Sequence, residues 1–110
     1  MTRKEIEKKL DNSPQYHFER DEFCKAFDAV FGNDFDVYEL FGTSNYKTFD
    51  LWYDEDTWYI YSKELDIAVS WYKGLGRINQ CTFENLDLVG LKTMLMTLGK
   101  EYQEIKEKER

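Results

Sequence analysis

The stretch that decides the fold lies near the end of the chain and reads LDLVGLKTMLMTLGKEYQEIKEK, residues 86–108. Its apolar residues recur at steps of three and four, which places them along one stripe of an α-helix. They are Leu88, Leu91, Leu95, Leu98, Tyr102 and Ile105. Asn85 or Thr82 stands where an N-cap is expected, and Asp87 adds favourable negative charge to the first turn. The stretch predicts a long amphipathic helix that needs an apolar surface to pack against.

Gly90 and Gly99 interrupt this helix, and each costs about 1 kcal/mol relative to alanine in a helix interior. We expect them where the helix closely approaches the sheet or a neighbouring helix. The alternative is a coiled-coil seam, and hence a homodimer through this helix. The apolar face of the chain's own sheet must be covered, and the same stripe of the helix can cover it. Packing within one chain is therefore the favoured interpretation.

Two further helices are expected before the strands. Residues 2–5 read as a capping box ahead of Ile6 and Leu10, which predicts a short first helix. Pro14 either ends that helix or opens the next one, because proline fits a first helical position. A second helix is predicted at 20–31. Its apolar stripe consists of Phe23, Phe27, Val30 and Phe31, and Gly32-Asn33 provides its C-terminal stop.

After residue 33 the apolar period changes from about 3.6 to 2, which is typical of strands. Strands are predicted at 35–40, 48–53, 57–62 and 65–72, with a short extension at 78–81. Their short connections favour an antiparallel meander. We therefore predict one α+β domain over residues 1–110, in the order α-α-β-β-β-β-α. Its helices are expected on one face of a four-stranded sheet, in two layers.

The formal net charge of −7 is unevenly distributed. Residues 34–66 hold nine carboxylates against Lys47 and Lys63 and therefore carry −7, whereas the other residues hold thirteen acids and thirteen bases. The nine are Asp34, Asp36, Glu39, Asp50, Asp54, Glu55, Asp56, Glu64 and Asp66. Such a surface repels phosphate backbones and attracts basic proteins. We expect no direct nucleic-acid binding.

No apolar run approaches the roughly 18 residues of a membrane span, and no apolar segment follows the basic N-terminus as in a signal peptide. Cys24 and Cys81 lie far apart, so two thiols are expected rather than a disulfide. We expect a cytoplasmic protein without a membrane anchor.

The candidates for chemistry are few. His17 and Cys24 would form a nucleophilic pair only if the fold brought them into hydrogen-bond reach beside an orienting group. The acidic run 54–56 lacks the glycine and distal glutamate of a calcium loop, and residues 74–77 do not lead straight into a helix as a phosphate loop does. We expect no catalytic residue, metal or cofactor.

The predicted strands carry aromatic residues as well as most of the excess carboxylates. Tyr38, Trp52, Trp58 and Tyr72 include residues that alternation places opposite the apparent core, where aromatic side chains serve as binding anchors. The predicted partner-binding residues are Asp36, Asp50, Trp52, Asp54, Glu55, Asp56, Trp58 and Asp66.

The run Ser70-Trp71-Tyr72-Lys73-Gly74-Leu75-Gly76-Arg77 resembles a stretch of small uncharacterised proteins carried by phages and mobile elements of Gram-positive bacteria. The resemblance covers about the last 45 residues and brings no known active site. It implies an accessory protein that binds a host protein. Some such proteins are acidic mimics of DNA that occupy restriction or CRISPR enzymes.

The leading hypothesis is a non-enzymatic module that binds a basic protein surface through its acidic, aromatic segment. A DNA-mimic inhibitor of a restriction or CRISPR nuclease is a sharper alternative. A small enzyme that uses carboxylates with Arg77 or Cys81, and a structural homodimer, are the other two.

Overall fold

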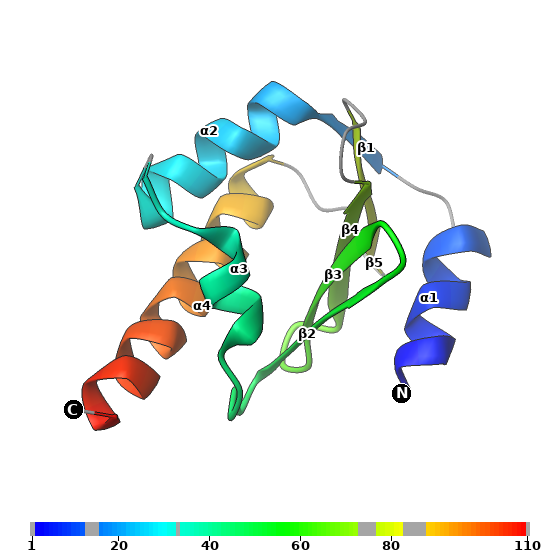
Figure 1. Cartoon of the computed structure of the whole chain (residues 1–110). Helices are drawn as coiled ribbons and strands as arrows, with labels where there is room; N and C mark the ends of the chain where they lie inside the picture. The colour runs from blue at the N-terminus through cyan, green and yellow to red at the C-terminus, as the bar shows by residue number, and fades with distance from the viewer. Residues whose placement is uncertain (1, 13–15, 33, 73–76, 83–87, 110) are drawn as a thin grey trace.

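The computed structural model describes residues 2–12, 16–32, 34–72, 77–82 and 88–109 (Figure 1). The elements in chain order are α1 (Arg3–Asn12), β1 (Tyr16–Glu19), α2 (Arg20–Phe31), α3 (Val37–Gly42), β2 (Phe49–Asp54), β3 (Thr57–Ser62), β4 (Ile67–Tyr72), β5 (Arg77–Thr82) and α4 (Leu88–Lys108). The protein is an α+β structure with an antiparallel sheet and a long C-terminal helix, as predicted.

The sheet has five strands within the described residues, in the order β1-β5-β4-β3-β2, and each pairs antiparallel with its neighbour. The predicted count of four is not confirmed. The strand predicted at 35–40 is wrong, because the chain there forms α3 instead. The predicted extension at 78–81 is part of a full strand, and β1 was not predicted.

A local cap explains why α3 is a helix. The Asp36 side chain accepts a hydrogen bond from the backbone N–H of Tyr38 at 2.9 Å, which satisfies one of the free donors of the first turn. The apolar residues Val37, Leu40 and Phe41 stand at positions i, i+3 and i+4, which fits one side of a helix and not the alternation of a strand. In a segment this short the cap and the burial of Leu40 outweigh the strand pattern.

The predicted start of the first helix and the predicted end of the second are confirmed. Thr2 and Glu5 form the capping box, in which each residue's backbone N–H is bonded to the other's side chain, at 3.4 and 3.2 Å. At the end of α2, Gly32 has φ +94° and donates its N–H to the Asp28 carbonyl at 2.8 Å. Glycine adopts this left-handed conformation without strain.

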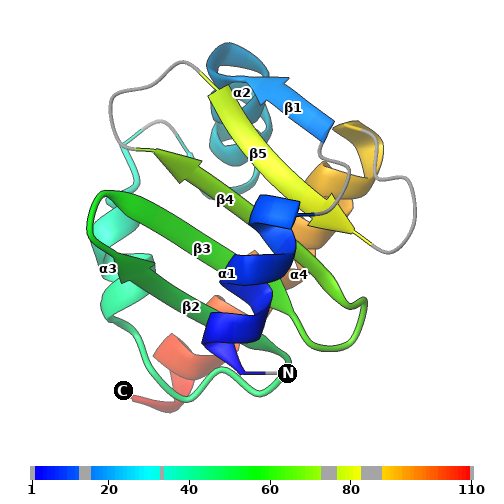
Figure 2. The same cartoon turned by 90° about the vertical axis from the view of Figure 1, so that its right-hand side faces the viewer.

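Helices cover both faces of the sheet, which corrects the predicted two-layer arrangement (Figures 1 and 2). We call the side covered by α2, α3 and α4 the main face, and the side covered by α1 the α1 face. Alternate strand residues are apolar on both sides. Leu51, Ile60 and Val69 belong to the main-face core, whereas Tyr61 and Ala68 belong to the α1-face core. A second apolar face also requires cover, and α1 provides it.

The apolar stripe of α4 forms the centre of the main-face core. Leu91, Met94, Leu95 and Leu98 have no exposed surface. These residues of the stripe therefore pack within the chain, as in the favoured interpretation.

Gly99 marks the close approach of two helices. A Cβ atom at this position would lie 3.0 Å from Cγ1 of Val30 and 3.5 Å from Cε1 of Phe31. Both neighbours belong to α2, so the prediction of close packing against a neighbouring helix is confirmed for this glycine.

Candidate protein-binding site

An aromatic cluster lies where α3 meets the hairpin of β2 and β3. The ring of Trp58 contacts Tyr38, Phe41 and Tyr53 at centroid distances of 5.1, 4.6 and 5.4 Å. Trp58 itself is 6% exposed, whereas Tyr38 is 54% and Tyr53 is 65% exposed. A buried indole thus supports two tyrosine rings that face solvent.

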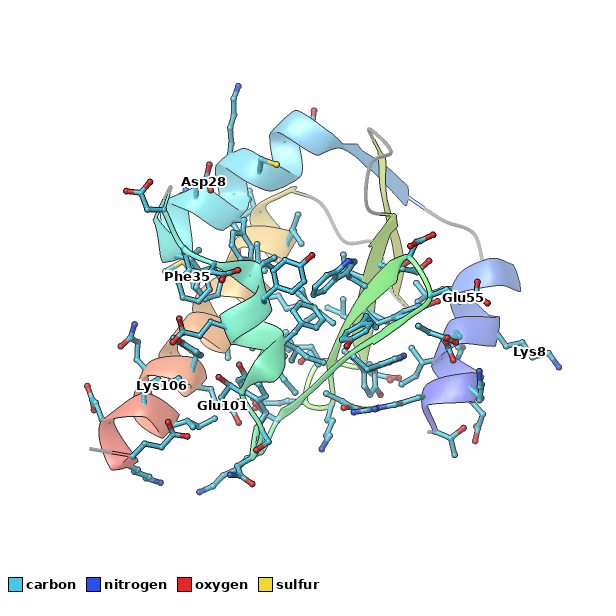
Figure 3. The ribbon with its side chains drawn as sticks, viewed as in Figure 1. Lys8, Asp28, Phe35, Glu55, Glu101 and Lys106 are labelled. Atoms are coloured by element: carbon cyan, nitrogen blue, oxygen red, sulfur yellow. The ribbon has the colours of Figure 1, made fainter. Side chains whose placement is uncertain are left out.

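Acidic residues border this cluster at the hairpin turn and at the start of α3. Glu55 and Asp56 connect β2 to β3 and are exposed (Figure 3). Asp36, the exposed N-cap of α3, lies two residues before Tyr38. We call the set Asp36, Tyr38, Tyr53, Glu55 and Asp56 the hairpin surface. Within the described residues, no ion pair involves its three carboxylates.

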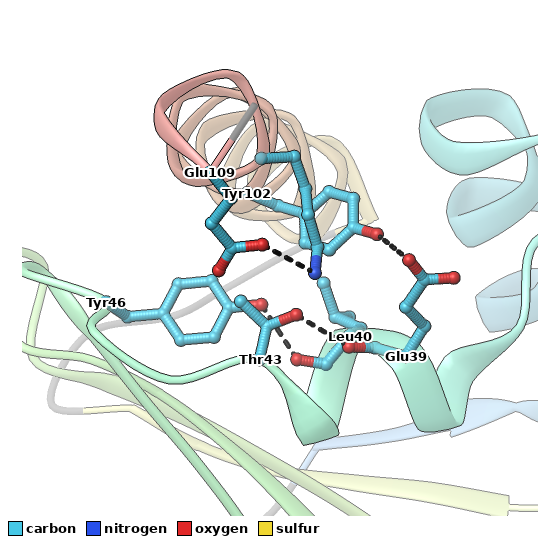
Figure 4. A network of polar contacts seen from close by, with 7 residues as sticks. Glu39, Leu40, Thr43, Tyr46, Tyr102 and Glu109 are labelled. Atoms are coloured by element: carbon cyan, nitrogen blue, oxygen red, sulfur yellow. Dashed lines mark hydrogen bonds and ion pairs between the residues drawn. The ribbon is translucent and has the colours of Figure 1, made fainter.

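A polar network between α3 and α4 holds Tyr38 in place indirectly (Figure 4). The Tyr102 hydroxyl donates to the Glu39 carboxylate at 2.9 Å, and the Tyr46 hydroxyl donates to the Leu40 carbonyl at 2.7 Å. Burial, followed by the contact with Glu39, raises the pKa of Tyr102 to about 12, and burial also raises the pKa of Tyr46. Because Glu39 is engaged in this network, it is a structural acid rather than part of the hairpin surface.

Two predicted binding carboxylates are paired with the chain's own first helix. Arg3 donates from Nη2 and Nε to the two oxygens of Asp50 at 2.7 and 3.0 Å, and Lys4 lies 3.4 Å from Asp54. The hydrogen bond to Asp50 raises the pKa of Arg3. Neither carboxylate is a free acid on the surface.

The two predicted tryptophan anchors are buried on opposite faces of the sheet. Trp58 lies on the main face and Trp52, 7% exposed, lies under α1. The two rings are therefore not exposed together, because helices cover both faces of the sheet. The exposed position that sequence reasoning missed is Tyr53, which shares a face with Trp58 at the end of β2, next to the turn. Alternation assigns Tyr53 to the core face, but not how far the helices extend over that face.

Asp66 lies apart from the hairpin surface. It follows β3 at the end of the sheet opposite the Glu55 turn and has φ +55°. Its carboxylate accepts a hydrogen bond from the Tyr61 hydroxyl at 2.5 Å. Burial, followed by this hydrogen bond, raises the pKa of Tyr61 to about 12. Of the eight predicted binding residues, three belong to the hairpin surface: Asp36 lies two residues before Tyr38, and Glu55 and Asp56 follow Tyr53 in the turn.

A groove of about 460 Å³ lies between α4 and the segment that enters β2. Its centre is Glu101, whose carboxylate accepts hydrogen bonds from the N–H of Thr48 at 3.1 Å, from the Thr48 hydroxyl at 2.5 Å and from the N–H of Lys47. Lysines and glutamates both line the rest of the groove. Glu101 therefore holds this segment against α4, which is a structural role.

Of the predicted candidates for catalysis, Cys24 is the one whose side chain lies within the described residues. Cys24 has a free, exposed thiol. The side chains of His17, Tyr72, Arg77 and Cys81 lie outside the described residues. Among the side chains that are described, no three His, Cys, Asp or Glu are placed to hold a metal ion. None of the helices in the described ranges has the length and apolarity needed to cross a bilayer.

Comparison of this chain with protein-family models, with curated proteins and with solved structures found no match.

Proposed function

We propose that the protein is a non-enzymatic binding module whose hairpin surface recognises a basic patch on a partner protein. The observation that carries the proposal is the packing of two solvent-facing tyrosines, Tyr38 and Tyr53, on the buried ring of Trp58, with carboxylates at the border. Tyrosine is enriched at interfaces because its ring buries apolar area while its hydroxyl hydrogen-bonds.

The two kinds of side chain have different roles in the proposed complex. The carboxylates of Asp36, Glu55 and Asp56 attract a basic surface and speed the encounter. The tyrosine rings supply most of the affinity once water is excluded. Because Trp58 and the bonds between α3 and α4 hold the rings in place, little side-chain entropy is lost on binding.

The backbone at Glu55 supports this assignment. Glu55 has φ +55°, in the left-handed region that costs a non-glycine residue about 1–2 kcal/mol. Glycine would adopt this turn without strain. Backbone strain is often found at binding sites, and Glu55 is the strained position that lies within the hairpin surface, whereas Asn45 and Asp66 lie outside it.

The sharper form of the proposal is a DNA mimic, in which the basic patch is the nucleic-acid site of an enzyme and the protein is the accessory factor of a phage or mobile element. Pairing of Asp50 with Arg3 and of Asp54 with Lys4 lowers the number of free carboxylates near the hairpin. The general protein-binding form is therefore the one that the geometry supports better.

The test is a selection of displayed random peptides on the intact protein. Selected peptides should be rich in Lys, Arg and aromatic residues, and their binding should weaken as salt rises from about 50 to 300 mM because exposed charges are screened. The double variants Tyr38→Ser/Tyr53→Ser and Glu55→Lys/Asp56→Lys should each weaken binding at least about tenfold, as expected for interface hot spots.

The control variant, Glu104→Lys/Glu107→Lys, makes the same charge change on an exposed part of α4 and should bind as the wild type does. Peptides that bind all three double variants equally well would refute the proposal. Competition by double-stranded DNA for a selected partner would support the mimic form, and binding that DNA does not affect would exclude it.

A further inference from the structure

The α1 face of the sheet is covered by an amphipathic helix of the same chain. Two apolar side chains of α1, Ile6 and Leu10, are each 2% exposed and pack on Trp52, Tyr61 and Ala68 of the sheet. They are four residues apart and so lie on one side of the helix. This is how an amphipathic helix binds a groove, with a few anchors one turn apart.

The basic first turn of α1 completes the match. Arg3 makes its bidentate pair with Asp50, and Lys4 lies beside Asp54. The Arg3 guanidinium also lies 5.2 Å from the centre of the Trp52 ring, within the range of a cation–π contact. The sheet surface therefore recognises a helix with two basic residues in its first turn, followed by apolar anchors on one side.

The fit between α1 and this surface is incomplete at Trp52. Its ring is 7% exposed and stacks on Tyr59 at a centroid distance of 5.0 Å, but its buried Nε1 donor has no hydrogen-bond partner among the described residues. A buried donor without an acceptor is destabilising. A different helix with an acceptor side chain at this point would satisfy the donor that α1 leaves unpaired.

We infer that the α1 face is a docking site for an amphipathic helix of a partner protein with a basic first turn, and that α1 occupies this site within the chain until such a helix displaces it. The site lies on the opposite side of the sheet from the main-face cluster that supports the hairpin surface, so the inference does not depend on the proposed function. Because α1 is tethered, its effective concentration is high, and the displacing helix must bind more tightly than α1 does.

The test supplies the α1 sequence in trans to the full-length protein. The probe is a labelled peptide of residues 2–12, TRKEIEKKLDN, and binding is followed by fluorescence anisotropy. The receptor is the full-length variant Ile6→Ser/Leu10→Ser, whose own α1 has lost both anchors. We expect this variant to bind the peptide at least tenfold more tightly than the wild type does, because its site is vacant.

Two matched changes establish specificity. Adding Asp50→Asn to the receptor should weaken binding at least fivefold, because the peptide's Arg3 loses its ionic partner. A peptide with Ile6→Ser and Leu10→Ser should not bind. The variant Tyr38→Ser/Tyr53→Ser, which tests the hairpin surface, should leave peptide binding unchanged when it is added to the receptor. Failure of one proposal is thereby distinguishable from failure of the other.

Hydrogen exchange keeps the result interpretable. In the wild type, α1 amides should exchange at least tenfold faster than those of β3 and α4, and β3 and α4 should stay protected in the receptor variant. A protected receptor that binds no peptide would overturn the inference. So would a receptor that unfolds, or wild-type α1 amides that exchange as slowly as those of α4, since α1 would then be an integral layer of the fold.

Discussion

The main face and the α1 face belong to the same sheet, yet they are covered very differently. Twelve of the described residues form the buried cluster on the main face, and five form the one on the α1 face. The main face is joined to its helices by apolar packing and by a hydrogen-bond network that includes Tyr102 and Glu39. The α1 face adds the bidentate Arg3–Asp50 pair and the Lys4–Asp54 pair at a more exposed rim, where salt screens them. The contrast suggests that one face holds the fold together and the other is suited to exchange.

The largest expected effect comes from truncating one buried apolar side chain in α4 and one in α1. Leu98→Ala on the main face should lower the free energy of unfolding by about 3 kcal/mol, because it leaves a cavity in a closely packed core. Ile6→Ala on the α1 face should lower it by only about 1 kcal/mol, because α1 can detach while the rest stays folded. Urea unfolding followed by circular dichroism measures both.

The control for that pair is Met96→Ala, at a position 57% exposed on α4, which should change the stability by less than about 0.5 kcal/mol. Equal losses for Leu98→Ala and Ile6→Ala would mean that the two faces are one cooperative core.

An intermediate effect is expected at alkaline pH, with one tyrosine on each face. Burial raises the pKa of both Tyr61 and Tyr102 to about 12, above the value near 10 of an unfolded chain. The stability that the folded protein gains from these two raised pKa values is fully present below pH 10. It is lost as the pH rises from about 10 to about 12, because only the unfolded chain then releases the proton. For each tyrosine, the free energy of unfolding then falls by up to about 1.4 kcal/mol per pH unit.

Urea unfolding at pH 9, 10, 11 and 11.5 measures this slope. Tyr102→Phe should flatten it in the global transition, whereas Tyr61→Phe should act mainly on the protection of α1 and β3. A slope that neither substitution changes would show that other groups cause the alkaline loss.

The smallest change in stability is expected at the turn between β2 and β3, two strands whose side chains contribute to both faces of the sheet. Glu55→Gly should raise the free energy of unfolding by about 0.5 kcal/mol, since relief of the left-handed strain exceeds the extra chain entropy that glycine loses. The same substitution should weaken binding to the basic peptides selected on the hairpin surface. A variant that is less stable than the wild type would show that the turn is not strained, and thermal unfolding measures the difference.

Much of the fold could be predicted because the relevant signals are local. The capping box at Thr2 and Glu5, the glycine stop at Gly32 and the stripe of α4 each act within a few residues. The strand at 35–40 was predicted wrongly because the alternation of Phe35 and Val37 is too short to decide, whereas the spacing of Val37, Leu40 and Phe41 and the Asp36 cap favour the helix. For the site, the sequence indicated the acids at Glu55 and Asp56 but could not separate them from Asp50 and Asp54, whose partners are about fifty residues away in the chain.

By itself, the sequence determined the three longer helices, the antiparallel pairing of the strands at 49–72 and the excess of negative charge at 34–66. Periodicity, caps and turns are properties of neighbouring residues, so no distant contact is needed to specify them. Only the tertiary structure decided which face each helix covers, which tryptophans are buried and which carboxylates meet Arg3 and Lys4. Those outcomes depend on pairs of segments far apart in the chain, and a strand pattern that is apolar on both sides does not say which helix will pack on which side.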